Sequence, residues 1–237
     1  MNIDIKTAWQ VFYNEFITKS GYERVFKGLL NTLIIAVLGL IIGIIIGTML
    51  SVTKVVPQKR TGAKVLSKLT DIYVGLFRGT PVVVQLLIFY YVLFPIIGLG
   101  SLPALTVAII TFGMNSGAYV CEIMRSGILS VDKGQMEAGR AVGLSYGRTM
   151  TKIVIPQAIK NILPTLGNEF ISLVKETSVA SFITVIDLTK AFQNIAAANY
   201  EYLIPYIVLA LCYLVIVYII TLIIKLLERR LRASDRR

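Results

Sequence analysis

The feature that most constrains this chain is a series of long apolar runs separated by short basic segments. The first run covers about residues 29–52 and meets no charged side chain before Lys54. A helix needs ~20 mainly apolar residues to cross the ~30 Å hydrocarbon layer of a bilayer. Only 16% of the 237 residues are charged and the mean hydropathy is +0.75, more apolar surface than one soluble core can bury. The sequence therefore predicts an all-α integral membrane protein.

Five membrane-spanning helices are predicted, and the fourth carries the weakest signal. The second span is interrupted by Arg78-Gly79-Thr80-Pro81, and the fourth contains Glu169, Lys175 and Glu176. The five spans cover about residues 29–52, 72–97, 102–124, 162–186 and 203–227.

The distribution of Lys and Arg predicts the orientation. These residues gather after the first span, after the third span and in the C-terminal tail, whereas residues 94–103 carry no charge. Because basic loops remain in the cytoplasm, an odd number of spans places the N-terminus outside and the C-terminus inside. We therefore expect three parts: an extracytoplasmic amphipathic segment over residues 1–28, a five-helix transmembrane domain over residues 29–227, and a basic cytoplasmic tail over residues 228–237.

Charge and motif content exclude several functions. The net charge of +11 lies in short loops between spans rather than on an aromatic-interleaved basic face, which argues against nucleic-acid binding. The chain has no histidine, the commonest acid–base catalyst and metal ligand, and we expect no metal site. No G-x4-G-K-[ST] motif is present to cradle ATP phosphates. The chain is therefore expected to be neither an enzyme nor a cofactor carrier.

Glycines at four-residue spacing mark one face of the first span. Gly39, Gly43 and Gly47 let a neighbouring backbone approach closely within a bilayer. We interpret this face as structural packing, with dimerisation as the alternative.

The segment after the third span, about residues 125–160, contains several residues that start, end or kink helices. Asp132 is a good helix N-cap, Gln135 has capping-box spacing, and Gly143 can end the helix in a left-handed conformation. Ser145 can cap the next helix, which Pro156 then kinks. The pattern predicts a helix, a glycine turn and a second helix at the cytoplasmic surface. Such an element is either a docking site for another protein or a solvated loop.

This segment resembles the EAA loop of ABC importer permeases, Glu-Ala-Ala-x3-Gly-x9-Ile-x-Leu-Pro. It departs from that pattern at Gly139 and Ile155. Further stretches between residues 70 and 190 are similar to the polar amino-acid permeases: Arg78-Gly79-Thr80-Pro81 before Gln85, Asn115-Ser116-Gly117-Ala118-Tyr119 before Glu122, and Lys175-Glu176-Thr177-Ser178. The EAA positions that match are Glu137, Ala138, Gly143, Ile153 and Pro156.

The resemblance implies the type I ABC importer permease fold in a bacterial plasma membrane. It implies that Glu137, Ala138, Gly139 and Gly143, with Arg140 at the rim, couple the chain to a cytoplasmic ATP-binding subunit. That partner would carry ATP and Mg²⁺. The resemblance also implies an extracytoplasmic substrate-binding protein, a second permease copy, and a polar amino acid, basic ones included, as substrate. A homodimer is favoured over pairing with a paralogue.

Polar stripes along two spans indicate where a substrate binds. Ionisable groups inside a membrane usually face protein or water-filled cavities. We expect both stripes, together with Gln85, to line one cavity, where Glu169 or Glu176 accepts an ammonium group and Asn115 or Gln85 meets a carboxylate. A structural ion pair remains the alternative for Glu176, whereas for Glu122, beside Arg125, a structural or gating pair is favoured over substrate contact. The stripes comprise Thr165, Glu169, Ser172 and Glu176 in the fourth span, and Asn115, Tyr119, Glu122 and Ser126 in the third.

Two other functions are consistent with a membrane chain of this kind. An ion-coupled secondary amino-acid transporter would also use carboxylates inside the membrane, but five spans show no evident inverted repeat. A non-transporting membrane scaffold would require none of these carboxylates for uptake.

Overall fold

The computed structural model describes residues 5–56 and 61–233. Part of the first predicted cytoplasmic loop, including Lys59 and Arg60, lies outside the described residues. The end of the predicted basic tail, with Arg236 and Arg237, lies outside them as well.

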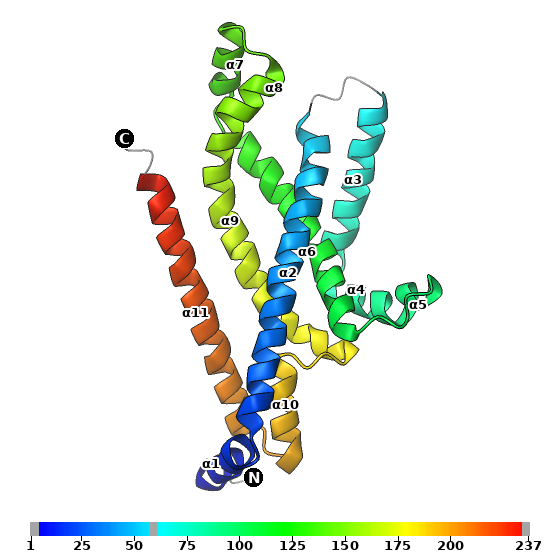
Figure 1. Ribbon diagram of the computed structural model, residues 1–237, viewed down its shortest axis with the longest axis vertical. Helices are drawn as coiled ribbons and strands as arrows, with labels where there is room; N and C mark the ends of the chain where they lie inside the picture. The colour runs from blue at the N-terminus through cyan, green and yellow to red at the C-terminus, as the bar shows by residue number, and fades with distance from the viewer. Residues whose placement is uncertain (1–4, 57–60, 234–237) are drawn as a thin grey trace. The chain divides into compact units, whose positions relative to one another are not determined.

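All regular elements over these ranges are helical, as the sequence predicts (Figure 1). In chain order they are α1 (Ile5–Tyr13), the π-helical turn η1 (Asn14–Thr18), α2 (Gly21–Val55), α3 (Thr61–Gly79), α4 (Val82–Ile88), the π-helical turn η2 (Phe89–Leu93), α5 (Phe94–Ile96), α6 (Ala104–Leu129), α7 (Lys133–Ala141), α8 (Tyr146–Thr149), the π-helical turn η3 (Met150–Val154), α9 (Ile155–Glu176), the 3-10 helix η4 (Thr177–Ile183), α10 (Leu188–Asn199) and α11 (Leu203–Ala233).

Among the described helices, three are long and apolar enough to span a membrane, namely α2, α6 and α11. A fourth candidate is the broken pair Thr61–Gly79 and Val82–Ile96. The break confirms the predicted interruption of the second span: Pro81 has no N–H to donate and disfavours helical geometry in the residue before it. An all-α membrane fold with three or four candidate spans is thus confirmed.

The fourth predicted span is less apolar than the other candidate spans. Helix α9 covers most of it but is not among the helices that meet the length and hydropathy requirements. Its sequence explains why, since polar and charged residues such as Lys160, Asn161, Asn168 and Glu169 lie among its apolar positions.

The chain folds as two compact units. The first contains Met1–Gly39, Pro81–Phe112 and Ser172–Ile220, and the second contains Leu40–Thr80, Gly113–Ile171 and Thr221–Arg237. Helices α2, α6, α9 and α11 contribute residues to both.

In the first unit, the amphipathic α1 packs on α10 and the beginning of α11. Ala8 and Phe12 lie in one buried apolar cluster with Leu188, Phe192, Ile195 and Ile204. The opposite side of α1 remains exposed, including Trp9 and Tyr13. The exposed side combines the aromatic rings of Trp9 and Tyr13 with the polar Lys6 and Gln10, a mixture that suits a membrane interface.

A buried carboxylate anchors this segment. The side chain of Glu15 pairs with Lys19 and accepts a hydrogen bond of 2.8 Å from Nδ2 of Asn199, at the end of α10. Arg24 approaches the same carboxylate at 3.9 Å. The hydrogen bond from Lys19, and then that from Asn199, hold the pKa of Glu15 below its usual value of 4.5.

The attachment of α1 should therefore weaken in acid. A carboxyl group whose pKa is lowered by folding stabilises the folded form above its unfolded pKa, and that contribution is lost as pH falls through the folded value. We expect Trp9, the only tryptophan in the chain, to show constant fluorescence at neutral pH and a transition below 4.5. The Glu15→Gln variant should lack the transition, and the exposed control Glu23→Gln should retain it. A transition that persists in Glu15→Gln would assign it to another group.

In the second unit, α2 and α6 pack at glycine contacts made by both helices. A Cβ atom at Gly43 would lie 2.7 Å from Ser116, and one at Gly47 would lie 2.6 Å from Val120. Reciprocally, a Cβ atom at Gly117 would lie 2.8 Å from Ile46. For Gly43 and Gly47, the glycine face of the first span thus packs within the chain, which is the structural reading predicted above.

Candidate functional site

The segment 132–149, which we call the helical knob, lies at one end of α9 (Figure 1). Asp132 caps α7 as predicted: its Oδ1 accepts a hydrogen bond from the Gly134 amide at 2.6 Å. Ser145 caps α8 by accepting from the Arg148 amide at 3.4 Å. Gln135 is used differently from the predicted capping box, since its side-chain oxygen accepts from Nε2 of Gln157 at 3.1 Å.

Gly143 ends α7 in the predicted left-handed conformation, with φ of +84°. The Gly143 amide donates to the Arg140 carbonyl at 3.1 Å, and the Leu144 amide donates to the Gly139 carbonyl at 3.1 Å. This arrangement satisfies carbonyl groups that the helix end would otherwise leave unpaired. Nη1 of Arg140 also donates to the Leu144 carbonyl at 2.8 Å.

One side of α7 faces outward. Glu137, Ala138 and Arg140 are exposed, and Val142, at the end of the helix, is 78% exposed. Gly139 instead faces inward and is buried. An apolar valine flanked by a carboxylate and a guanidinium on a rigid, capped helix has the chemistry of a protein-docking surface.

The buried side of α7 explains the departure from the EAA pattern at Gly139. A Cβ atom there would lie 2.5 Å from Cγ2 of Thr149 and 3.1 Å from Cδ1 of Ile153. The methyl group of Thr149 thus occupies the space that an alanine side chain would need.

We expect Gly139→Ala to destabilise the knob by about 1–3 kcal/mol, the usual cost of overpacking. Thr149→Ser should relieve the clash in the double variant, because it removes the methyl group and keeps the hydroxyl that donates to the Ser145 carbonyl. Thermal unfolding of the purified protein measures both effects. Gly147→Ala is the matched control, since a Cβ atom there would meet nothing within 4 Å. Equal melting temperatures for Gly139→Ala and Gly147→Ala would contradict the packing argument.

The knob is joined to α2 as well as to α9. The hydroxyl of Tyr146 donates to the Val55 carbonyl at 3.3 Å, at the last residue of α2. Toward α9, the π-helical turn η3 precedes Pro156, which has no amide hydrogen for the regular helical bond.

The predicted stripe on α6 faces α3. The Nδ2 atom of Asn115 donates to the Phe77 carbonyl at 3.4 Å, and the Arg78 guanidinium lies 5.4 Å from the centroid of the Tyr119 ring. Glu122 pairs with Arg125 one turn along the same helix, with Nη2 of Arg125 at 2.8 Å from Oε2. Glu122 thus has the Arg125 partner that the structural or gating interpretation requires.

Glu169 on α9 meets a different side of α6. Its Oε1 accepts a hydrogen bond of 2.9 Å from the hydroxyl of Ser116, which is fully buried. Ser116 is the residue that sequence reasoning missed, although it lies inside the quoted motif Asn115-Ser116-Gly117. Within this unit Asn115 thus contacts α3 and its neighbour Ser116 contacts Glu169 on α9, because adjacent helix positions point about 100° apart.

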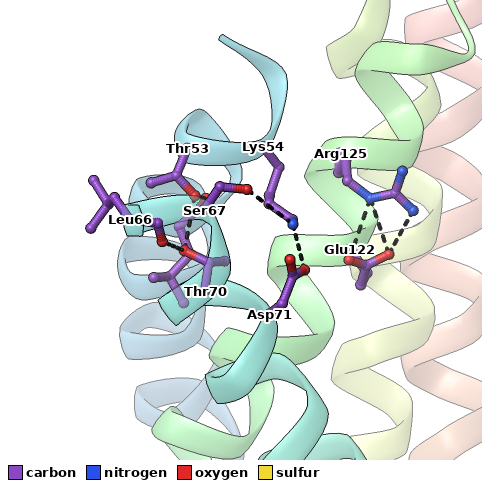
Figure 2. A network of polar contacts seen from close by, with 9 residues as sticks. Thr53, Lys54, Leu66, Ser67, Thr70, Asp71, Glu122 and Arg125 are labelled. Atoms are coloured by element: carbon purple, nitrogen blue, oxygen red, sulfur yellow. Dashed lines mark hydrogen bonds and ion pairs between the residues drawn. The ribbon is translucent and has the colours of Figure 1, made fainter. Parts of the chain in front are cut away.

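The ends of α2, α3 and α6 carry a further polar network, which Figure 2 shows. Lys54 pairs with Asp71, and its ammonium group donates to Ser67 at 3.2 Å. The hydroxyls of Thr53 and Thr70 lie 2.9 Å apart. Asp71 lies toward the Glu122–Arg125 pair in the same view. The Lys54 and Thr53 contacts tie α2 to α3, whereas the Glu122–Arg125 pair lies within α6. Neither Asp71 nor Ser67 was predicted from the sequence.

The remaining predicted binding residues belong to the first unit. Gln85 is buried on α4, Ser172 is half-buried on α9, and Glu176 is exposed at the end of α9. Among the described residues, no group of three or more His, Cys, Asp or Glu side chains is arranged to hold a metal ion.

Comparison with known proteins identifies the family. Residues 39–233 match the family described as "Binding-protein-dependent transport system inner membrane component". The chain belongs to this family. It is accordingly a multi-pass permease subunit of a bacterial ABC transporter in the inner membrane, and it is not itself an ATPase. The predicted family and permease function are confirmed.

Individual relatives cover most of the chain. The arginine transport system permease protein ArtQ of Bacillus subtilis is 40% identical over 89% of this chain and 94% of its own length. A putative glutamine transport system permease protein GlnP of Rickettsia bellii is 39% identical over 93% of this chain and 99% of its own length.

Solved structures agree with these relatives. A crystal structure of an amino acid ABC transporter with histidines contains a chain that is 36% identical. It superposes with a TM-score of 0.82 over 97% of this chain and all of that chain. The MetNI methionine ABC transporter, at 20% identity and a TM-score of 0.66, shares the fold.

Proposed function

We propose that this permease subunit imports polar amino acids, and that the helical knob transmits movement from a cytoplasmic ATP-binding subunit. The observation that carries the proposal is the exposed side of α7, held between the Asp132 cap and the left-handed Gly143. Glu137 and Ala138, which match the EAA loop, are exposed beside Arg140 and Val142, and we propose that they form the docking surface. Because the knob is bonded to both α2 and α9, a displacement of α7 reaches two membrane helices at once.

We further propose five spans with the N-terminus outside, in the type I permease arrangement. This topology makes α9 the fourth span, although its hydropathy alone does not require it. Without α9, one of the basic segments would lie outside the cell, against the positive-inside rule. The hydrogen bond between Ser116 and Glu169 supports this topology, because it gives a carboxylate of α9 a partner within the protein.

The substrate contact is proposed at Glu169. A carboxylate that is half-buried and oriented by a buried hydroxyl is suited to an ammonium or guanidinium group. The relatives named for arginine and glutamine transport are consistent with a polar or basic amino acid. Asn115, Gln85, Ser172, Glu176 and Glu122 remain proposed members of the same pathway.

The proposed assembly contains two copies of this chain, an ATP-binding subunit that holds ATP and Mg²⁺, and an extracytoplasmic binding protein. The family description itself names dependence on a binding protein. We expect that a single five-span subunit does not enclose a pathway by itself, and that a second copy, or a paralogue, completes it.

Reconstitution tests the proposal against an ion-coupled transporter. The complex is placed in vesicles with the ATP-binding subunit and the binding protein, and uptake of labelled arginine and glutamine is measured. We expect uptake to require ATP and both partners, and to be unaffected by ionophores. Uptake by the permease alone that collapses with an ionophore would overturn the proposal.

A further inference from the structure

A polar pocket that opens to the surface lies at the base of the knob, outside the proposed transport pathway. It occupies about 480 Å³ between the end of α6 and the first turns of α9. This volume is within the range of roughly 300–1,000 Å³ that is usual for small-molecule sites. We call it the polar cup; its lining residues are Ser130, Val131, Asp132, Gln157, Lys160 and Asn161.

The walls of the polar cup are held in place by side-chain hydrogen bonds. Nδ2 of Asn161 donates to the hydroxyl of Ser130 at 2.9 Å. Nε2 of Gln157 donates to the Ile153 carbonyl at 3.0 Å and to Gln135 at 3.1 Å. Both amide nitrogens are thus turned toward protein acceptors, which leaves the amide oxygens of these two side chains as acceptors for a ligand.

The lining of the cup includes one positively charged and one negatively charged side chain. Lys160 supplies an ammonium group, and Asp132 supplies a carboxylate. One oxygen of Asp132 caps α7, and the other is an additional acceptor. The formal charges cancel, so the cup favours neither a simple anion nor a simple cation. A ligand with one ammonium and one carboxylate group matches it, with the carboxylate at Lys160 and the ammonium at Asp132 and the amide oxygens.

We propose that the polar cup binds a free amino acid from the cytoplasm and that this binding slows the transport cycle. The proposal rests on the proposed function, which places residues 125–160 in the cytoplasm and makes the knob the element that moves. Asp132 lies at the start of α7, whereas Lys160 lies on α9, so a bound zwitterion joins the two elements. A ligand that prefers one arrangement of a cycling protein shifts the population toward it and slows any cycle that must leave it. The imported product is itself a ligand of this chemical class.

Vesicles with separate contents on their two sides test the proposal. The binding protein and labelled arginine or glutamine, whichever the complex transports, are trapped inside, and ATP is added outside. Only complexes with the ATP-binding subunit outside then transport, and they release label outward. Unlabelled L-glutamine added outside meets the cytoplasmic side alone. We expect it to reduce the initial rate at least ~2-fold, and we expect Lys160→Gln to raise the midpoint concentration ~10-fold, as loss of one charge-assisted hydrogen bond would.

Controls identify the ligand and the site. N-acetyl-glutamine lacks the ammonium group and glutamine methyl ester lacks the carboxylate, so neither should inhibit. Lys152→Gln, which removes an exposed lysine of η3 outside the cup, should respond to L-glutamine like the wild type. A phosphatidylethanolamine headgroup carries similar charges, and inhibition that follows its content rather than added L-glutamine would overturn the amino-acid assignment.

The vesicle experiment distinguishes failure of the polar-cup proposal from failure of the proposed function. Release that never depends on ATP, even without external L-glutamine, contradicts the proposed function. Normal ATP-driven release that L-glutamine does not slow, or slows equally in wild type and Lys160→Gln, overturns the polar cup alone.

Discussion

Gly143→Asp should abolish most ATP-driven uptake while leaving membrane insertion intact. Gly143 has φ of +84°, a conformation that costs roughly 1–2 kcal/mol for a residue with a side chain. The substitution also places a negative charge at the carboxyl end of α7, where the helix dipole is already negative. Both effects act on the exposed surface that we propose contacts the ATP-binding subunit.

We expect uptake by Gly143→Asp to fall at least ~10-fold, the effect of about 1.4 kcal/mol, with normal amounts of chain in the membrane. ATP hydrolysis should continue at its basal rate but no longer respond to the loaded binding protein. Gly143→Asn is the matched control, because asparagine resembles aspartate in size and in its tolerance of the left-handed conformation but adds no charge, so its uptake should fall less. Uptake by Gly143→Asp at the wild-type rate would contradict the coupling role of the knob.

Glu169→Gln should have the second large effect, this time on substrate affinity. The carboxylate accepts a hydrogen bond of 2.9 Å from Ser116 and is half-buried, so replacing it removes a charge that the fold holds in place. Hydrogen bonds to charged groups contribute about 1.5–3 kcal/mol, which corresponds to a ~10- to 150-fold rise in KM for a cationic or zwitterionic amino acid.

Transport kinetics across a series of amino acids measure this effect. The loss should be larger for arginine than for glutamine if Glu169 meets the side chain, and equal if it meets the common ammonium group. Ser116→Ala should give a smaller loss, because it removes the orienting hydroxyl and retains the charge. Glu23→Gln, an exposed carboxylate near the N-terminus, should behave like the wild type. An unchanged KM in Glu169→Gln would exclude the residue from the substrate site.

Local chemistry in the sequence was sufficient to predict the knob. Asp132 and Gly143 act on backbone groups only two to four residues away, so their roles depend on neighbours in the chain rather than on the rest of the fold. The break after Gly79 was predictable for the same reason, because Pro81 alone removes a backbone donor. The long apolar runs likewise predicted α2, α6 and α11.

The sequence was less informative where a helix carries both polar and apolar residues. Helix α9 was predicted as a span from its position and from loop charges, and its hydropathy does not by itself support that assignment. A polar face of this kind is stable in a membrane only if another helix covers it. Whether one does is a property of the packed protein and of its partners.

The sequence by itself thus determined the helical membrane class, the positions of the breaks and caps, and the family. Only the tertiary structure decided which polar residues meet. Asn115 and Ser116 are adjacent, yet one donates to the end of α3 and the other to Glu169 on α9. The pairing of Gly139 with Thr149 and that of Lys54 with Asp71 are also outcomes of packing. The physical reason is that each helix position points about 100° from the next, so partners depend on how every helix is rotated against its neighbours.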